Sequence, residues 1–263
     1  MGCYNDEILF IHIPKCAGWT VKNYMKDNLP GVVMPTDPDP ENPMIQAMPM
    51  GHIRLQDIEA ATGRHPSTWE KIVAVVRNPY ERELSQALYW ATRALKGHSH
   101  IHDKTTWKYV REWILREDVA SAALESGKVF QWLPEHIDFT GWILDSDTQF
   151  HVWYEQHVID PRKTRKGYSD FGGFYRYWLE LDAVMPDNLH IIKQENIAEE
   201  LPRVLFPERD NFDPPPPVPT MNKTNYVRAT IAYYTPLAAR IVDERYRYCF
   251  DQGWYKSWHE GKA

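Results

Sequence analysis

The chain has 263 residues, of which 43% are hydrophobic and 25% charged, and its formal net charge is -6. This composition is typical of a folded globular protein and excludes a wholly disordered chain. The acidic balance disfavours a general nucleic-acid binder, and no uncharged apolar run is long enough to span a membrane. The three cysteines, Cys3, Cys16 and Cys249, have the spacing of neither a zinc site nor a disulfide framework, so we expect a cytoplasmic protein.

The order of the expected elements indicates an α/β fold. Short apolar runs predict buried strands at 8–13, 71–76 and 189–193. Apolar residues at helical spacing predict helices at 18–28, 53–62, 79–95, 107–117, 119–125, 197–205 and 235–250. Prolines predict a loop at 30–49 and an extended spacer at 214–217. Strands that alternate with helices favour a parallel sheet covered on both faces.

The segment 13–20, IPKCAGWT, joins the first strand to the first helix and suits a phosphate. A helix N-terminus presents backbone N–H groups to an anion. Lys15 adds a positive charge, Gly18 allows close approach, and Thr20 offers a hydroxyl donor. The order of residues differs from a Walker A loop, in which the lysine comes at the end.

Two other interpretations of this segment stay open. Cys16 in an anion-binding turn suggests a cysteine phosphatase, but that chemistry needs an arginine after five intervening residues, where this chain has Lys22. The segment could also be an ordinary turn between a strand and a helix.

A second motif, 76–85, follows the second strand. Arg77 stands at the strand end, where its guanidinium can bind a phosphate with two hydrogen bonds. Ser85 follows about two helical turns later and can face the same side. Together the two motifs resemble the 5′-phosphosulfate and 3′-phosphate motifs of sulfotransferases that use 3′-phosphoadenosine 5′-phosphosulfate (PAPS), especially the carbohydrate-modifying branch. Weaker resemblance covers 191–201 and the C-terminal segment from Asn222 to Tyr255.

The resemblance implies a single domain over residues 1–263, with a P-loop-like parallel sheet flanked by helices. It does not cover the middle of the chain, roughly residues 96–187, where the residues themselves predict a helical, aromatic-rich insertion. It implies PAPS as the co-substrate, adenosine 3′,5′-bisphosphate as the product and no metal. The nucleotide-binding residues that it implies are Lys15, Cys16, Ala17, Gly18, Trp19, Thr20, Arg77, Ser85 and Lys223. Trp19 departs from the family, which usually has a small hydroxyl residue there.

Lys15 and His52 are the expected catalytic residues. Lys15 would stabilise the bridging oxygen as the S–O bond breaks. Gly51-His52 is similar to the segment that supplies a histidine base in related enzymes, and a histidine titrates near neutral pH. A structural role for His52 stays open, and Glu195 is a second candidate for the base. We expect His12 to be structural, within the first strand.

Three further features allow both a functional and a structural interpretation. His98, His100 and His102 could bind a metal or belong to a loop that contacts the acceptor. The basic cluster Arg162, Lys163, Arg165 and Lys166 could bind an anion or form a solvated face. Some tryptophans could line a sugar site, although most will be core: Trp90, Trp107, Trp132, Trp142 and Trp153.

The sequence thus predicts an enzyme that transfers a sulfuryl group from PAPS to a hydroxyl acceptor, with a carbohydrate or glycolipid as the expected acceptor. Two alternatives remain: a P-loop kinase, and a non-catalytic module that binds a nucleotide or a glycan.

Overall fold

The computed structural model describes residues 2–34, 52–95, 174–209, 214–219 and 230–258. The chain divides into two compact units, and each is described by itself. The first comprises residues 1–78, 154–221 and 245–257, and the second comprises 79–153, 222–244 and 258–263. The single domain expected over 1–263 stays a prediction. The histidine triplet, the basic cluster and most of the expected middle insertion lie outside the described residues.

The first unit contains a four-stranded, mostly parallel sheet in the order β1-β2-β3-β4. The three strands expected from the sequence are parallel neighbours: β2 (Ile8–Ile11), β3 (Lys71–Val76) and β4 (Leu189–Lys193). The expected strand at 8–13 is two residues too long, because β2 ends at Ile11. The sequence did not predict β1 (Cys3–Tyr4), which pairs with β2 in the antiparallel sense.

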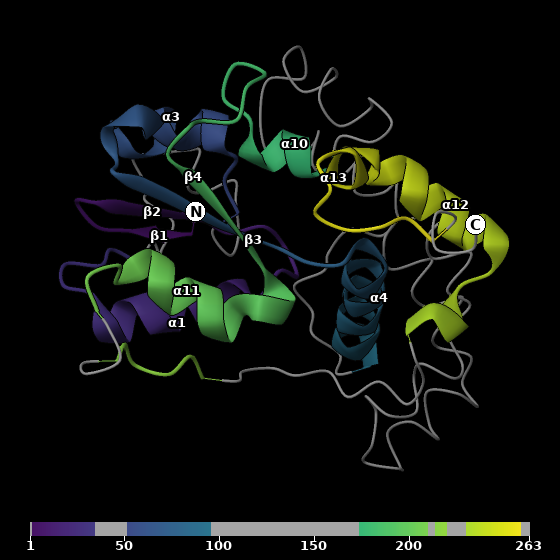
Figure 1. The fold of residues 1–263 in the computed structure, drawn as a ribbon. Coiled ribbons are helices and arrows are strands. Elements are labelled where there is room, and N and C mark those ends of the chain that lie inside the picture. Colours follow the sequence, from purple (N-terminus) through teal and green to yellow (C-terminus); the bar gives the residue numbers. More distant parts are fainter. Residues whose placement is uncertain (1, 35–51, 96–173, 210–213, 220–229, 259–263) are drawn as a thin grey trace. The chain divides into compact units, whose positions relative to one another are not determined.

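Helices cover both faces of this sheet. Figure 1 shows α1 (Gly18–Asn28) and α11 (Ile197–Leu205) on one face, and α3 (Ile58–Thr62) and α10 (Phe174–Leu179) on the other. Short 3-10 turns lie at Leu55–Asp57, Pro66–Thr68 and Gln194–Asn196, and α13 (Arg247–Asp251) follows near the C-terminus. The fold is therefore mixed α/β, as predicted.

The core of this unit lies on both faces of the two central strands. All four residues of β2 are buried, and so are five of the six in β3. Each large apolar side chain buried in this way stabilises the fold by about 1.5–3 kcal/mol. The hydroxyl of Tyr24 on α1 donates to the carbonyl of Pro216 at 2.6 Å, which ties the predicted proline spacer to the helix.

The second unit is described through α4 (Pro79–Leu95), a 3-10 turn (Thr230–Tyr233) and most of α12 (Pro236–Arg245). Pro79 begins α4, as expected for a proline in the first helical turn. Tyr80 connects these segments, because its hydroxyl donates to Asp243 and its carbonyl accepts from the Tyr234 hydroxyl at 2.5 Å.

The single helix expected at 235–250 is instead two helices. Tyr246, with φ -111° and ψ 17°, interrupts the helical backbone between α12 and α13. Its side chain is fully buried, with ring-centroid distances of 5.0 Å to Phe174 and 5.6 Å to Tyr175. The helical backbone is therefore interrupted at the residue whose ring packs against Phe174 and Tyr175. The spacing of apolar residues alone did not indicate this break.

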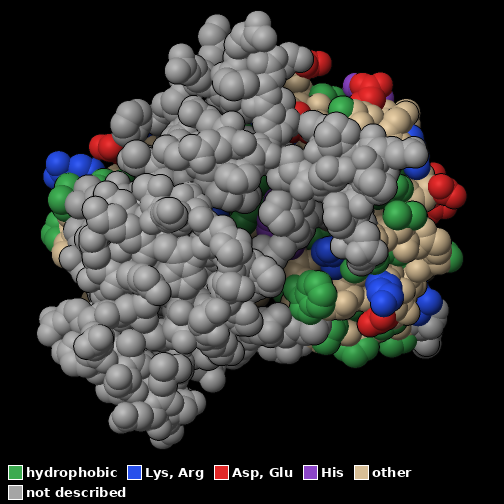
Figure 2. Space-filling model, turned by 180° about the vertical axis from the view of Figure 1, so that it is seen from behind, with side chains coloured by type: hydrophobic (Ala, Val, Ile, Leu, Met, Phe, Trp, Pro, Cys, Tyr) green, Lys and Arg blue, Asp and Glu red, His purple; other side chains and the backbone are tan. Residues whose placement is uncertain are grey.

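No helix among the described residues is both long enough and apolar enough to cross a membrane. On the face drawn in Figure 2, basic and acidic side chains of the described residues lie among hydrophobic ones.

Candidate functional site

The loop between β2 and α1 has an unusual backbone. Lys15 and Ala17 both have positive φ, 67° and 53°, although neither is glycine. Left-handed backbone costs a residue with a Cβ about 1–3 kcal/mol and is concentrated at ligand-binding sites. Left-handed residues that alternate with right-handed ones turn successive N–H groups toward one point, which forms a concave anion site. Two left-handed residues separated by one position are the feature of such a site that the expected phosphate loop shares.

The first N–H groups of α1 have no acceptor among the described residues. Ala17 occupies the N-cap position and makes no side-chain capping bond. Within the described part of the chain, no acceptor contacts the N–H groups of Ala17, Gly18, Trp19 and Thr20. These donors, together with the positive end of the helix dipole, can bind a phosphate or sulfate oxygen without displacing a protein group.

Gly18 is required here by the ring of His12. A Cβ built on Gly18 would lie 1.8 Å from both Cδ2 and Nε2 of His12. The imidazole therefore lies directly against the main chain at the start of α1. His12 was expected inside a strand with a structural role, but it lies one residue beyond β2 and forms part of the loop's floor.

His52 reaches the same loop from 40 residues away. Its Nδ1 lies 2.9 Å from the main-chain oxygen of His12, and the two imidazole centroids are 4.2 Å apart. A carbonyl oxygen only accepts hydrogen bonds, so Nδ1 of His52 carries a proton. In the neutral ring Nε2 then holds the lone pair, which is the form that a general base needs.

Positive groups gather around His12. Burial lowers the pKa of His12 well below the ordinary 6.5, and the charges of His52, Lys22 and Lys15 lower it further. His12 is therefore neutral at pH 7. Within the described residues its buried Nδ1 has no hydrogen-bond partner. The loop thus combines free N–H donors with two lysines close to a neutral imidazole, a setting that attracts an anion.

Arg77 connects the second motif to this loop. It is buried, and its Nη1 donates to the main-chain oxygen of Lys15 at 3.3 Å. Tyr175 fixes the main chain of Arg77, because its hydroxyl donates to the Arg77 oxygen at 2.6 Å and accepts from the Arg77 nitrogen at 3.0 Å. The sequence did not indicate Tyr175, since its partner is 98 residues away and no local pattern marks it.

The thiol of Cys16 is also close to Tyr175, with 3.8 Å from Sγ to the hydroxyl oxygen. Cys16 is fully buried. A nucleophilic cysteine needs access to its substrate, so this burial argues against the cysteine phosphatase interpretation.

Glu195 has a bracing position at the carboxyl ends of β3 and β4. Its carboxylate accepts from the Asn78 main-chain nitrogen at 3.2 Å and from the Tyr255 hydroxyl at 2.7 Å. Burial, followed by the charge of Glu195, raises the pKa of that hydroxyl. With its oxygens used in this way, Glu195 is less suited than His52 to act as a base.

The remaining predicted residues have different surroundings. Thr20 is buried, whereas the Trp19 side chain is 53% exposed beside the loop. Ser85 is buried on α4 in the second unit, so its role with Arg77 stays a prediction. Lys223 lies outside the described residues. The part of the chain that is described contains no group of three side chains able to hold a metal ion.

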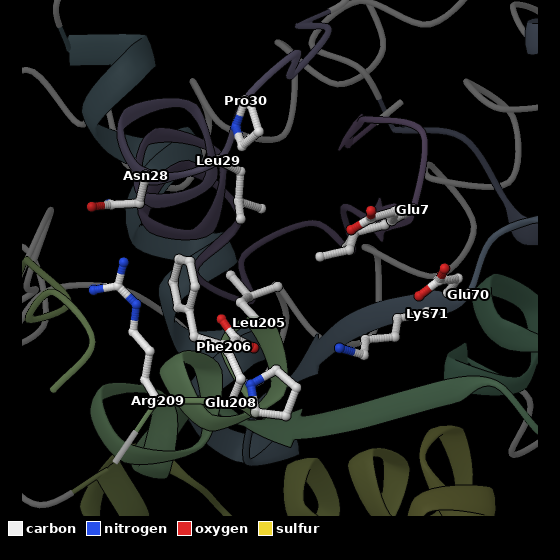
Figure 3. Close-up of a pocket in the computed structure, with 12 residues that line it drawn as sticks. Glu7, Asn28, Leu29, Pro30, Glu70, Lys71, Leu205, Phe206, Glu208 and Arg209 are labelled. Atoms are coloured by element: carbon white, nitrogen blue, oxygen red, sulfur yellow. The ribbon is translucent and has the colours of Figure 1, made fainter. Parts of the chain in front are cut away.

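A cavity of about 550 Å³ opens at the other end of the sheet, beside the first residues of β2 and β3. Glu7, Glu70 and Lys71 line one side of it, and Phe206 and Arg209 line the opposite side (Figure 3). In open α/β sheets ligands bind at the carboxyl ends of the strands. Its position and its mixed charges therefore make this cavity a weaker candidate than the loop.

Comparisons with protein-family models, with curated proteins and with solved structures give no match for this chain.

Proposed function

We propose that the chain is a sulfotransferase that moves the sulfuryl group of PAPS to a hydroxyl of an acceptor. The observation that carries this proposal is the hydrogen bond from His52 to the main chain of His12. It brings the expected base to the expected anion loop and sets the tautomer in which Nε2 can accept a proton.

The donor site that we propose combines the two motifs. The free N–H groups of residues 17–20 and the ammonium of Lys15 bind the 5′-phosphosulfate, and Arg77 binds the 3′-phosphate. Gly18 leaves room for the His12 ring, which lies against the main chain at the start of α1. In this proposal the sheet is a P-loop-like core, supported by the turn from β2 into α1 and by the parallel neighbour β3, which ends just before Arg77.

The chemical step then needs positioning and charge stabilisation. His52 Nε2 removes the proton from the acceptor hydroxyl as its oxygen attacks sulfur. The bond between sulfur and the bridging phosphate oxygen breaks, and adenosine 3′,5′-bisphosphate leaves. Lys15 and the loop N–H groups stabilise the negative charge that grows on the departing phosphate.

The exposed indole of Trp19 supports a carbohydrate acceptor. It is 53% exposed and follows Gly18 directly, so it borders the loop where the sulfuryl group would be held. An aromatic ring offers a flat apolar face on which a sugar ring can stack.

The test is incubation with radiolabelled PAPS and a panel of sugars, glycolipids and phenols. We expect label on at least one hydroxyl acceptor, and we expect His52→Ala to lower kcat at least 100-fold while leaving the affinity for adenosine 3′,5′-bisphosphate within twofold. His190→Ala, at an exposed histidine of β4, is the matched control. Equal activity of His52→Ala and the wild type would exclude His52 as the base.

A further inference from the structure

Lys22 is a buried lysine that has no counter-charge among the described residues. It is 6% exposed, and within the described residues it makes no hydrogen bond and no ion pair. Burying an ammonium costs several kcal/mol unless an anion compensates it. The proposed reaction uses Lys15 and does not use Lys22.

The groups nearest to Lys22 do not neutralise it. Burial raises the pKa of the Cys3 thiol to about 12, so at pH 7 this thiol carries no charge. The Lys22 nitrogen lies 5.9 Å from the centre of the Trp19 ring. A cation–π contact with a partly exposed ring is weak and offsets only a small part of the cost of burying the ammonium. Among the described residues, no anionic group therefore compensates the charge of Lys22.

Helix geometry favours a Lys22 side chain directed toward the N-terminus of α1. In a helix the Cα–Cβ bonds tilt toward the N-terminus, so Lys22 covers the turn formed by Gly18 and Trp19. Its contact with Trp19, three residues earlier, agrees with this direction. Its charge also lowers the pKa of His12, whose ring lies on Gly18. The charge of Lys22 is thus close to Trp19 and His12, which border the turn whose N–H groups have no acceptor among the described residues.

We propose that Lys22 is a second anion-binding lysine of this loop, which with Lys15 binds a ligand carrying two adjacent phosphate or sulfate groups. The inference deepens the proposed function, and its natural ligand, the phosphosulfate of PAPS, rests on that function. A loop with one lysine and a helix N-terminus suits a single anionic group. The second ammonium favours a ligand with more negative charge.

The test uses inorganic pyrophosphate and Lys22→Met, which keeps the length of the side chain and removes its charge. Lys26→Met is the matched control, since Lys26 is exposed one turn later on the same helix. Urea unfolding is followed in chloride buffer, with and without millimolar pyrophosphate, at equal ionic strength.

We expect pyrophosphate to raise the urea midpoint of the wild type and of Lys26→Met. In Lys22→Met we expect pyrophosphate to bind at least tenfold more weakly. Without pyrophosphate, Lys22→Met should be at least as stable as the wild type, because it lacks a buried charge with no partner. A wild-type response in Lys22→Met, or no response in the wild type, would overturn the inference.

Two additional measurements keep the test decisive. If Lys22→Met does not fold, Lys22→Gln replaces it, and Lys22→Arg should keep most of the pyrophosphate response. Titration with adenosine 3′,5′-bisphosphate then separates the two proposals. A pyrophosphate response that needs Lys22, without any response to the bisphosphate, would support Lys22 and contradict PAPS as the donor. If the wild type responds to the bisphosphate but Lys22→Met keeps its full pyrophosphate response, the result would support PAPS as the donor and contradict the role of Lys22.

Discussion

The Nη1 atom of Arg77 lies 3.3 Å from the main-chain oxygen of Lys15, to which it donates a hydrogen bond. Residues 62 positions apart therefore meet where β2 and β3 end, at the edge of the sheet where ligands of open α/β folds bind. The contact joins the two segments that carry the resemblance to PAPS-dependent sulfotransferases.

Arg77→Ala should weaken the binding of adenosine 3′,5′-bisphosphate about 10- to 150-fold. The substitution removes hydrogen bonds between the guanidinium and a charged phosphate, which contribute about 1.5–3 kcal/mol to binding. This free energy corresponds to the expected loss of affinity. Calorimetric titration measures the affinity, and Arg203→Ala on the exposed side of α11 is the control. Unchanged affinity in Arg77→Ala would remove Arg77 from the site.

Tyr175→Phe should lower the free energy of unfolding by about 1–3 kcal/mol. The substitution leaves the buried N–H and C=O groups of Arg77 without the hydroxyl that now satisfies both. Urea unfolding measures the change. Tyr4→Phe is the control, because the Tyr4 hydroxyl makes no hydrogen bond within the described part of the chain, and it should cost less than 0.5 kcal/mol. Equal effects of the two substitutions would contradict the bracing role.

Gly18→Ala should destabilise the protein by about 1–3 kcal/mol and abolish anion binding. The new methyl group would overlap the His12 ring, which must then move together with His52. Gly63→Ala tests whether any Gly→Ala change has this effect. Its added Cβ meets nothing within 4 Å, so only the strain of a φ of 71° remains. Anion binding should persist in Gly63→Ala and be lost in Gly18→Ala.

Stability should fall in mild acid because of His12. The pKa of His12 is lower in the folded state than the 6.5 of the unfolded chain, so below pH 6.5 the unfolded state binds the extra proton. This contribution is fully present above pH 6.5 and is lost by up to about 1.4 kcal/mol per pH unit as the pH falls toward the folded-state pKa.

His12→Phe isolates this contribution, since it keeps a ring over Gly18 and removes the titrating group. The difference in unfolding free energy between pH 7.5 and pH 5 should be smaller in His12→Phe than in the wild type. An equal pH dependence in both proteins would show that His12 titrates normally.

Trp19→Ala should raise the KM for a carbohydrate acceptor about tenfold and leave the affinity for adenosine 3′,5′-bisphosphate within twofold. The exposed indole can stack on a sugar, whereas the donor is bound through the main chain of the loop. Trp19→Phe should raise this KM less than Trp19→Ala does, because the phenyl ring can still stack on a sugar. A loss of donor affinity instead would place the indole against the nucleotide.

Local patterns predicted much of the fold. The bounds of α1, β3, α4, β4 and α11 agree with the sequence, because Gly18, Pro79 and buried apolar runs mark where these elements begin. The two-residue strand β1 has no periodicity to detect. The break at Tyr246 coincides with packing against rings more than 70 residues earlier in the chain, which apolar spacing does not reveal.

The candidate site was predictable only in part. Lys15, His52 and Arg77 stand in motifs, and the structure brings all three to the same loop or its neighbours. The role of His12 depends on where β2 ends, and that of Tyr175 depends on a contact across 98 residues. Lys22 carried one usable signal: a lysine four residues after Gly18 points back over it in a helix.

Thermal unfolding with adenosine 3′,5′-bisphosphate, compared with AMP and with ATP and magnesium, tests the central claim most directly. At about 100 times its dissociation constant a ligand adds about 2.7 kcal/mol to the free energy of unfolding. If PAPS is the donor, the bisphosphate should stabilise the protein, AMP should stabilise it little, and the effect of the bisphosphate should be lost in Arg77→Ala. Stabilisation by ATP with magnesium alone would indicate a kinase, and no stabilisation by any of the three would contradict PAPS as the donor.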